Sequence, residues 1–296
     1  MLSKENLTFL FLVYGVPALV GGLCFLVGWS RGLKREMFSN ERRSLLDAVG
    51  LCVAYVWGHY ALKGWDGVPP RLGENWLPWG VALAGVLILL RKRERDVRGG
   101  FWVWVSLVFL ATLGAMLGSL AYYADVVFWK RLGVLAAFFV GALIFYYGLV
   151  LIAEQLRAGD FFLFLFIMLG MAAAFFYTTN SITMGQLVVI PIVAALPAFV
   201  VAMRRKDYRV TTLYAYLAGM IFSCLMSYNH FGAAVSPPVS TLVLWMLAPG
   251  GAYLGMVLFS GGRGQALYLT VVYLVMFAVS TGALVIARRA FEPAGY

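Results

Sequence analysis

Two histidines are the side chains of this sequence best suited to move a proton, and both lie beside other polar residues. Residues spaced three or four apart lie on one face of a helix. By this spacing, one helix face carries Cys52, Tyr55, His59 and Lys63. If that face lines a cavity, His59 can exchange a proton or bind a polar head group. The alternative is an interior stripe whose polar groups bond to one another, with Lys63 extending to the membrane surface.

A second polar stripe comprises Tyr216, Ser223 and Ser227, and it leads to Asn229 and His230. Hydroxyl groups in membrane helices usually bond to neighbouring backbones, so interior packing is one interpretation. The other interpretation is a site near the membrane surface, because both stripes end at the same depth on the topology given below.

Polar residues of several segments are expected to meet in the outer third of the membrane. They are His59, Lys63, Asp66, Thr178, Thr179, Asn180, Ser227, Asn229 and His230. Together they define a candidate outward-facing polar vestibule. The alternative is that they are ordinary polar residues of loops and helix ends.

Metal and cofactor sites are not indicated by the sequence. Imidazole is a common ligand of haem and of metal ions, but neither histidine has a cysteine or carboxylate beside it at metal-ligand spacing. The cysteines Cys24, Cys52 and Cys224 lie within apolar runs and form no CxxC pair. The sequence also contains no phosphate-binding loop, HExxH or GxSxG motif. We therefore predict no metal, no cofactor and no catalytic residue.

Pro249, Gly250 and Gly251 interrupt a later apolar run. Proline removes a helix hydrogen bond and glycine permits unusual backbone angles, so these residues are the best candidate for an unwound helix. The favoured interpretation is a kink that gives room to a neighbouring helix through Gly251 and Gly255.

Composition identifies lipid as the solvent of most of the chain. Of 296 residues, 62% are hydrophobic and 12% are charged, against roughly 25% charged in an ordinary soluble domain. The longest polar stretches are far shorter than the roughly 50 residues that a separate domain needs. The sequence therefore predicts an all-α polytopic transmembrane helix bundle without a soluble domain.

About ten membrane spans are predicted, near residues 7–29, 44–63, 76–90, 101–123, 132–153, 161–177, 185–203, 210–228, 240–260 and 266–287. The third span is short and the ninth contains the Pro-Gly-Gly sequence, so eight or nine full crossings are the alternatives. In the first span, Pro17 and the pair Gly21-Gly22 predict a kink or a close helix contact.

The charge cluster from Arg91 to Arg98 fixes the orientation of the spans. One Arg or Lys at the centre of a membrane helix costs roughly 2.5 to 3.5 kcal/mol, so this cluster must lie in water, on the cytoplasmic side by the positive-inside rule. Counting from it places the N-terminus outside, and we expect a bacterial inner membrane. The net charge of +10 then faces anionic head groups at the cytoplasmic face, and it requires no nucleic-acid partner.

The middle of each predicted span is free of carboxylates, because Asp47, Asp125 and Glu154 all lie near span ends. Ion pumps usually need ionisable groups at that depth, so a pump is disfavoured. The favoured function is a non-catalytic subunit or scaffold of a membrane assembly, with membrane lipids and other membrane subunits as partners.

Two alternative functions have distinct structural requirements. A carrier or channel for a neutral or lipidic molecule requires a midplane cavity between the spans at 185–203 and 240–260. An intramembrane enzyme acting on a lipid-linked substrate requires His59, His230 and an acid such as Asp66 to converge within hydrogen-bond reach. A dry, closely packed bundle favours the scaffold.

Overall fold

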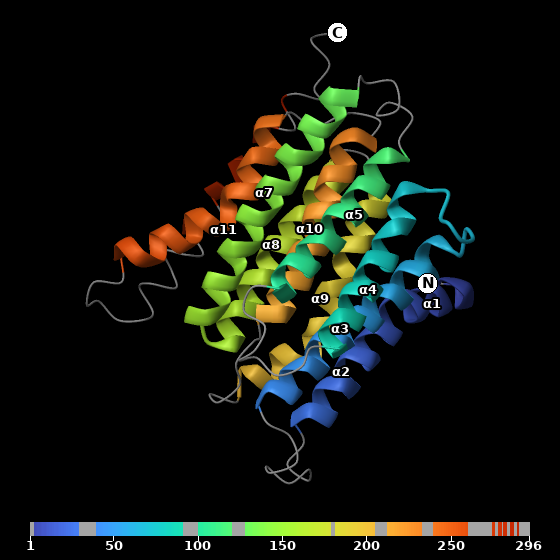
Figure 1. The fold of residues 1–296 in the computed structure, drawn as a ribbon. Helices are drawn as coiled ribbons and strands as arrows, with labels where there is room; N and C mark the ends of the chain where they lie inside the picture. The colour runs from blue at the N-terminus through green and yellow to red at the C-terminus, as the bar shows by residue number, and fades with distance from the viewer. Residues whose placement is uncertain are drawn as a thin grey trace.

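The computed structural model describes residues 3–29, 40–90, 100–119, 128–178, 181–204, 212–232 and 239–259, with short helical pieces between 274 and 289. Every regular element in these residues is a helix, as the predicted all-α fold requires (Figure 1). Five helical segments are long and apolar enough to cross a membrane: Lys4–Val27, Gly73–Leu90, Phe128–Gln155, Ala158–Tyr177 and Ile182–Ala202. The described part of the chain is therefore a bundle of apolar helices.

Helices occupy each of the first nine predicted ranges. In chain order they are α1 (Lys4–Leu10), the π-helix η1 (Phe11–Gly15), α2 (Val16–Trp29), α3 (Asn40–Lys63), the 3-10 helix η2 (Gly73–Asn75), α4 (Trp76–Leu90), α5 (Gly100–Gly118), α7 (Phe128–Gln155), α8 (Ala158–Thr178), α9 (Ile182–Ala202), α10 (Thr212–Gly232) and α11 (Val239–Phe259). The short third range gains the turn η2, which extends the apolar segment to 18 residues. The tenth range, 266–287, lies mostly outside the described residues.

The central element of the bundle is α10, which packs against α3, α4, α5, α7, α9 and α11 (Figure 1). Each residue from Leu213 to Ser227 is buried. Because protein rather than lipid surrounds this helix, it can carry polar groups that find partners on its neighbours. The Tyr216 hydroxyl donates to the Val105 carbonyl of α5 at 2.8 Å, and the Ser227 hydroxyl donates to the Ser223 carbonyl at 2.8 Å. The polar stripe of this segment is thus part of the interior packing.

The first span bends at a π-turn immediately before Pro17. In η1 the Val16 N–H bonds to the Phe11 carbonyl, five residues back. The next carbonyl, that of Leu12, would need the N–H of Pro17, which proline lacks. The indole Nε1 of Trp57 in α3 donates to it instead, at 3.2 Å. A side chain of α3 thus satisfies the carbonyl that Pro17 leaves without an N–H donor.

Glycines in the first span permit close contact between helices. A Cβ atom on Gly21 would collide with the backbone carbonyl of Ala194 in α9, and one on Gly22 would lie 3.2 Å from the Pro197 ring. On the other side, a Cβ atom on Gly50 of α3 would lie 2.8 Å from the Cys24 Cβ. The close contact predicted at Gly21-Gly22 is confirmed.

The candidate unwound helix at Pro249, Gly250 and Gly251 is not formed, because α11 continues as an α-helix through these residues. Their role is in helix contact. A Cβ atom on Gly148 of α7 would lie 2.8 Å from the Pro249 Cβ and 2.9 Å from the Gly250 nitrogen. Here two backbones approach each other without intervening side chains, which is how small residues associate membrane helices.

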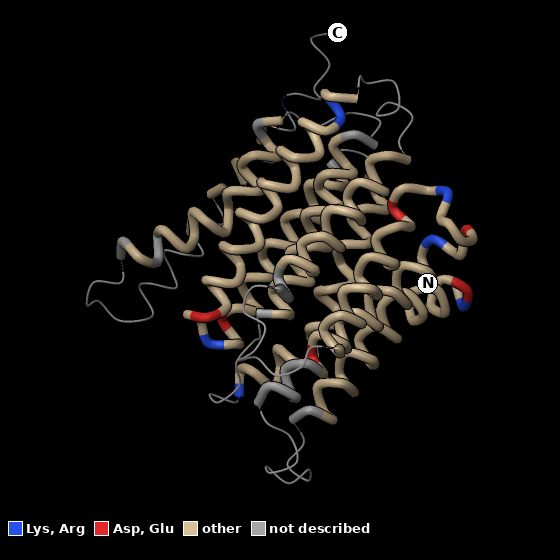
Figure 2. Tube along the Cα trace, viewed as in Figure 1, with Lys and Arg blue, Asp and Glu red and all other residues tan. Residues whose placement is uncertain are grey.

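The charged residues of the described ranges lie at two opposite ends of the bundle and leave its middle uncharged (Figure 2). One of these ends contains the N-terminus and the connection between α3 and α4. This arrangement fits a hydrocarbon layer across the middle of the bundle, because charged groups are expensive there and inexpensive at the water interface.

The contact between α7 and α11 can be tested by adding one methyl group. We expect Gly148→Ala to destabilise the protein by about 1–3 kcal/mol, because the methyl group would overpack a contact between two backbones. Unfolding of the purified protein by SDS measures this change. Gly141→Ala on the same helix is the matched control, because its Cβ would lie at an ordinary 3.6 Å from the nearest atom of Met246. Equal stability of the two variants would contradict the proposed packing.

Candidate functional site

Polar side chains converge where α3 ends and α4 begins, and we call this group the α3–α4 polar cluster. Its members are His59, Lys63, Asp66, Glu74, Asn75 and Tyr228. The helix α3 stops at Lys63 because Gly64 takes a left-handed conformation with φ of +75° while its N–H still bonds to the Tyr60 carbonyl. The chain can therefore turn back toward the bundle directly after α3.

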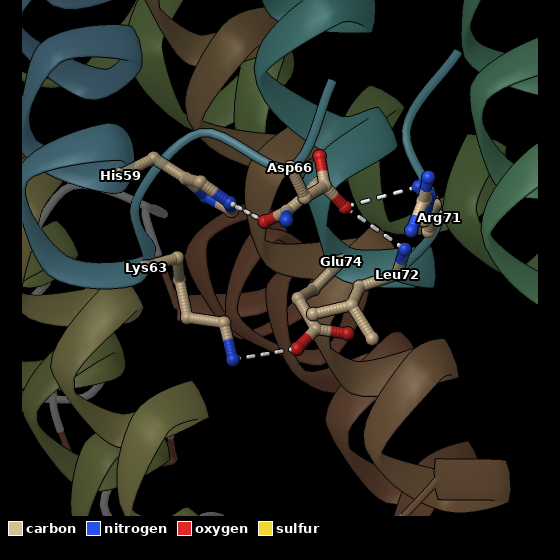
Figure 3. Close-up of polar contacts among 7 residues, drawn as sticks. His59, Lys63, Asp66, Arg71, Leu72 and Glu74 are labelled. Atoms are coloured by element: carbon tan, nitrogen blue, oxygen red, sulfur yellow. Dashed lines mark hydrogen bonds and ion pairs between the residues drawn. The ribbon is translucent and has the colours of Figure 1, made fainter. Parts of the chain in front are cut away.

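Asp66 organises the loop that follows. One of its carboxylate oxygens, Oδ2, accepts hydrogen bonds from the backbone N–H groups of Arg71 and Leu72, each at 3.0 Å (Figure 3). These bonds close the loop and direct the next residues inward. Gly73 then fits a space without room for a side chain, because a Cβ atom there would collide with Ser119 and lie 2.5 Å from the Tyr228 ring.

The 3-10 turn η2 places two polar residues inside the bundle. Glu74 is 6% exposed and Asn75 is fully buried. The sequence analysis missed both residues, because they lie in a polar stretch that was assigned to a loop. One signal in the sequence could have identified them. The predicted span that begins at Trp76 is too short to cross a membrane, so the residues before it, Glu74 and Asn75, must supply its first turn.

His59 and Asn75 form a buried hydrogen bond between α3 and η2. The Nε2 atom of His59 lies 2.9 Å from the Oδ1 atom of Asn75 (Figure 3). Because an amide oxygen only accepts, Nε2 carries the proton in this arrangement. In a neutral imidazole the second ring nitrogen, Nδ1, then carries no proton. The Nδ1 atom of His59 has no hydrogen-bond partner. This bond therefore fixes the ring orientation of His59.

Lys63 and Glu74 form an ion pair with 2.7 Å between Nζ and Oε1 (Figure 3). The Lys63 side chain is 20% exposed, whereas the Glu74 side chain is 8% exposed. The Tyr228 hydroxyl of α10 also donates to the Glu74 carboxylate. The carboxylate thus joins the end of α3 to the C-terminal part of the central helix, at the N-terminus of α4, where the helix dipole favours negative charge.

The pKa of Asp66 is lowered from its ordinary value of 3.8. The largest cause is the hydrogen bond from the Leu72 N–H, followed by the nearby Asn75 side chain and the Arg71 N–H. Donors that face a carboxylate stabilise its charged form, which lowers the pKa. Asp66 is therefore ionised throughout the neutral range, and its charge serves to hold the loop.

Three other residues of the predicted vestibule lie on α10. Ser227 and Asn229 are buried there, and the His230 ring lies 5.8 Å from the Phe138 ring of α7. Tyr228 of α10 faces Glu74. Because residues two positions apart on a helix point in directions that differ by roughly 200°, His230 faces a different side of α10. The side chain of Thr178 and both Thr179 and Asn180 lie outside the described residues.

The cluster therefore contains three of the predicted vestibule residues, His59, Lys63 and Asp66, but His59 is fully buried and lines no open surface. The His59 ring bonds to Asn75, whereas the His230 ring lies against Phe138 of α7. Within the described ranges, no group of three His, Cys, Asp or Glu side chains is placed to hold a metal ion. The geometry is that of a structural connection among α3, η2 and α10.

No protein-family model, curated protein or solved structure matches this chain. The function proposed below therefore rests on the geometry of this chain alone.

The hydrogen bond between His59 and Asn75 can be tested by a double-mutant cycle. We expect Asn75→Leu to destabilise the protein by about 1–3 kcal/mol, because it leaves the buried His59 Nε2–H without an acceptor. His59→Leu combined with Asn75→Leu should cost less than the sum of the two single changes, because both polar groups are then removed. SDS unfolding measures the three variants, and strictly additive effects would exclude the proposed coupling.

The Asp66 loop should respond to acid but not to changes of pH in the neutral range. Because the folded pKa lies below 3.8, the stabilisation is complete above that value and is lost as the pH falls through the folded pKa. The amide NMR signals of Arg71 and Leu72 should therefore titrate with a midpoint below 3.8. Asp66→Ala should abolish this titration. A midpoint at or above 3.8 would contradict the assigned hydrogen bonds.

Proposed function

We propose that this chain is a non-catalytic subunit or scaffold of a membrane assembly, and that it acts through its outer surface. The observation that carries the proposal is the closed packing around α10, whose residues from Leu213 to Ser227 are all buried. A hollow between α5, α7 and α10 holds only about 10 Å³, whereas one water needs roughly 10–15 Å³. In this region the Tyr216 hydroxyl bonds to the Val105 carbonyl of α5, and the Ser227 hydroxyl bonds to the Ser223 carbonyl within α10.

We further propose a topology of about ten spans with the N-terminus outside, in a bacterial inner membrane. The two bands of charge at the ends of the bundle support it (Figure 2). In this arrangement the α3–α4 polar cluster lies at the outer surface. The positive charge of the loops then faces anionic lipid head groups on the cytoplasmic side.

The carrier and enzyme alternatives have less support. A carrier was expected to use a cavity between the seventh and ninth spans, but α9 packs mainly on α2, α3 and α8, whereas α11 packs mainly on α7. The continuous α11 also removes the unwound segment that such a path would use. The enzyme alternative lacks the convergent histidines, because His230 faces α7 while His59 bonds to Asn75.

A surface suited to a partner helix lies along α8. Its outward-facing residues recur at alternating spacings of four and three. These residues are Leu163, Ile167, Gly170, Ala174 and Tyr177. This spacing is typical of helix–helix contacts, and small residues at the centre permit close approach. No described atom lies within 4 Å of a Cβ built on Gly170, so the face has no close helix partner among the described residues.

The proposal predicts a partner that binds in fixed stoichiometry. Native mass spectrometry of the protein, purified in mild detergent from its own membrane, should show a complex with a second membrane protein. Gly170→Leu should remove most of that complex, because a branched side chain would separate the helices. Gly133→Leu is the matched control, because Gly133 is also exposed without a close neighbour but lies on α7. Purification of the wild type as a lone monomer would refute the proposal.

A further inference from the structure

An apolar groove runs along the outer surface of the bundle between α3 and α4. Its volume is about 690 Å³, within the range of roughly 300–1,000 Å³ that is typical of small-molecule sites. The floor contains small side chains, among them Cys52, Ala82 and Gly85, and the lining atoms are almost entirely apolar. The groove is therefore suited to a hydrocarbon ligand without hydrogen-bonding groups.

Aromatic side chains fix the walls of the groove. Trp57 flanks it, and the hydrogen bond from its indole to the Leu12 carbonyl holds the ring in place. At the end nearer the α3–α4 connection, the Tyr60 and Trp65 rings lie 4.9 Å apart, and Trp65 lies 5.8 Å from Trp79. These rings make the groove a formed hollow in the lipid-facing surface, with one end marked by aromatic residues.

The shape of the groove fits a narrow flexible chain better than a protein helix. A helix with its side chains is roughly 10–12 Å across and approaches a neighbour closely where small residues line the contact. Here the bulky rings of Trp57 and Trp65 stand at the rim, each about half exposed. Along α3 the groove extends from Val49 to Ala61, which is about 18 Å at 1.5 Å per residue. One leaflet contributes about 15 Å of hydrocarbon, half of the roughly 30 Å core.

The loop that carries Trp65 at the aromatic end of the groove also carries a cation. Arg71 is exposed, and its backbone N–H bonds to Asp66, the residue that follows Trp65. Lys63 is already paired with Glu74, whereas no acidic side chain of the described residues pairs with Arg71. Tryptophan rings and a cation at one end of an apolar groove match the order of head group and acyl chain in a lipid.

We propose that the groove between α3 and α4 binds one acyl chain of a glycerophospholipid, whose phosphate is held by Arg71. The inference requires only that the bundle lies in a membrane, and it does not depend on a partner subunit. The groove orders the chain, and the loop closed by Asp66 holds Arg71 at the depth of the head group.

Photocrosslinking tests the acyl-chain part of the proposal. The full chain is reconstituted in nanodiscs containing a phospholipid with a diazirine in one acyl chain, and crosslinked residues are mapped by mass spectrometry. Crosslinks should concentrate on groove residues such as Val53 and Val86, above those on Leu247, an equally exposed residue of α11. Ala82→Phe should reduce the groove crosslinks several-fold by filling the hollow, whereas Leu247→Phe should leave them unchanged.

Retention of lipid tests the head-group part. After delipidation in detergent, native mass spectrometry should detect one retained phospholipid on the wild type and less on Arg71→Gln. Lys130→Gln is the matched control, because Lys130 is another exposed cation. Even crosslinking over all exposed residues that Ala82→Phe does not change would overturn the proposal, since it would indicate bulk lipid only. Crosslinks that fail because a segment of this chain or a second copy fills the groove would overturn it as well.

Discussion

A hydrocarbon layer offers no hydrogen bonds, and that constraint explains where the polar groups of this bundle lie. Each polar atom at membrane depth must find its partner within the protein. The helix α10, which carries one of the two polar stripes, is accordingly surrounded by other described helices. The same requirement accounts for the hydrogen bond from the Trp57 indole to the Leu12 carbonyl, which Pro17 leaves without an N–H. Polarity and burial therefore coincide, in contrast to the pattern of a soluble bundle.

Helix association in this solvent depends on close packing, because burial of apolar surface provides little driving force when lipid is equally apolar. Three contacts illustrate this dependence. Gly21 meets the Ala194 carbonyl, Gly148 meets Pro249, and Gly73 fits against Tyr228. Each contact brings the backbone of a glycine directly against another helix. The first two join long helices of the bundle, and the third places η2 inside the end of the bundle.

Hydropathy predicted the helices well, because each apolar run must cross or line the membrane and polar residues mark its ends. The start of α4 at Trp76 and the contact at Gly21-Gly22 followed from such local signals. The structure at Pro249 is decided by a tertiary contact. A Pro-Gly-Gly sequence suits either an unwound helix or a close contact, and the choice is made by Gly148, which lies a hundred residues away in the sequence.

The candidate site was predicted only in part for the same reason. His59, Lys63 and Asp66 were identified from helical spacing and loop position, but their partners were not. Burial of Glu74 and Asn75 depends on the loop that Asp66 closes and on the space beside Tyr228, and neither is encoded in the local sequence. Hydropathy assigns such residues to an aqueous loop because it cannot anticipate that a neighbouring helix supplies their hydrogen bonds.

The ion pair between Lys63 and Glu74 acts more through specificity than through net stability. Burying a charge is expensive, and a buried pair often contributes little beyond what apolar side chains would provide. Once formed, however, the pair opposes any rearrangement that would leave Glu74 alone in the bundle. It therefore holds η2 in one position, and with it the loop that carries Trp65 and Arg71. A buried polar cluster without an open surface of its own can in this way fix the position of residues that face the lipid.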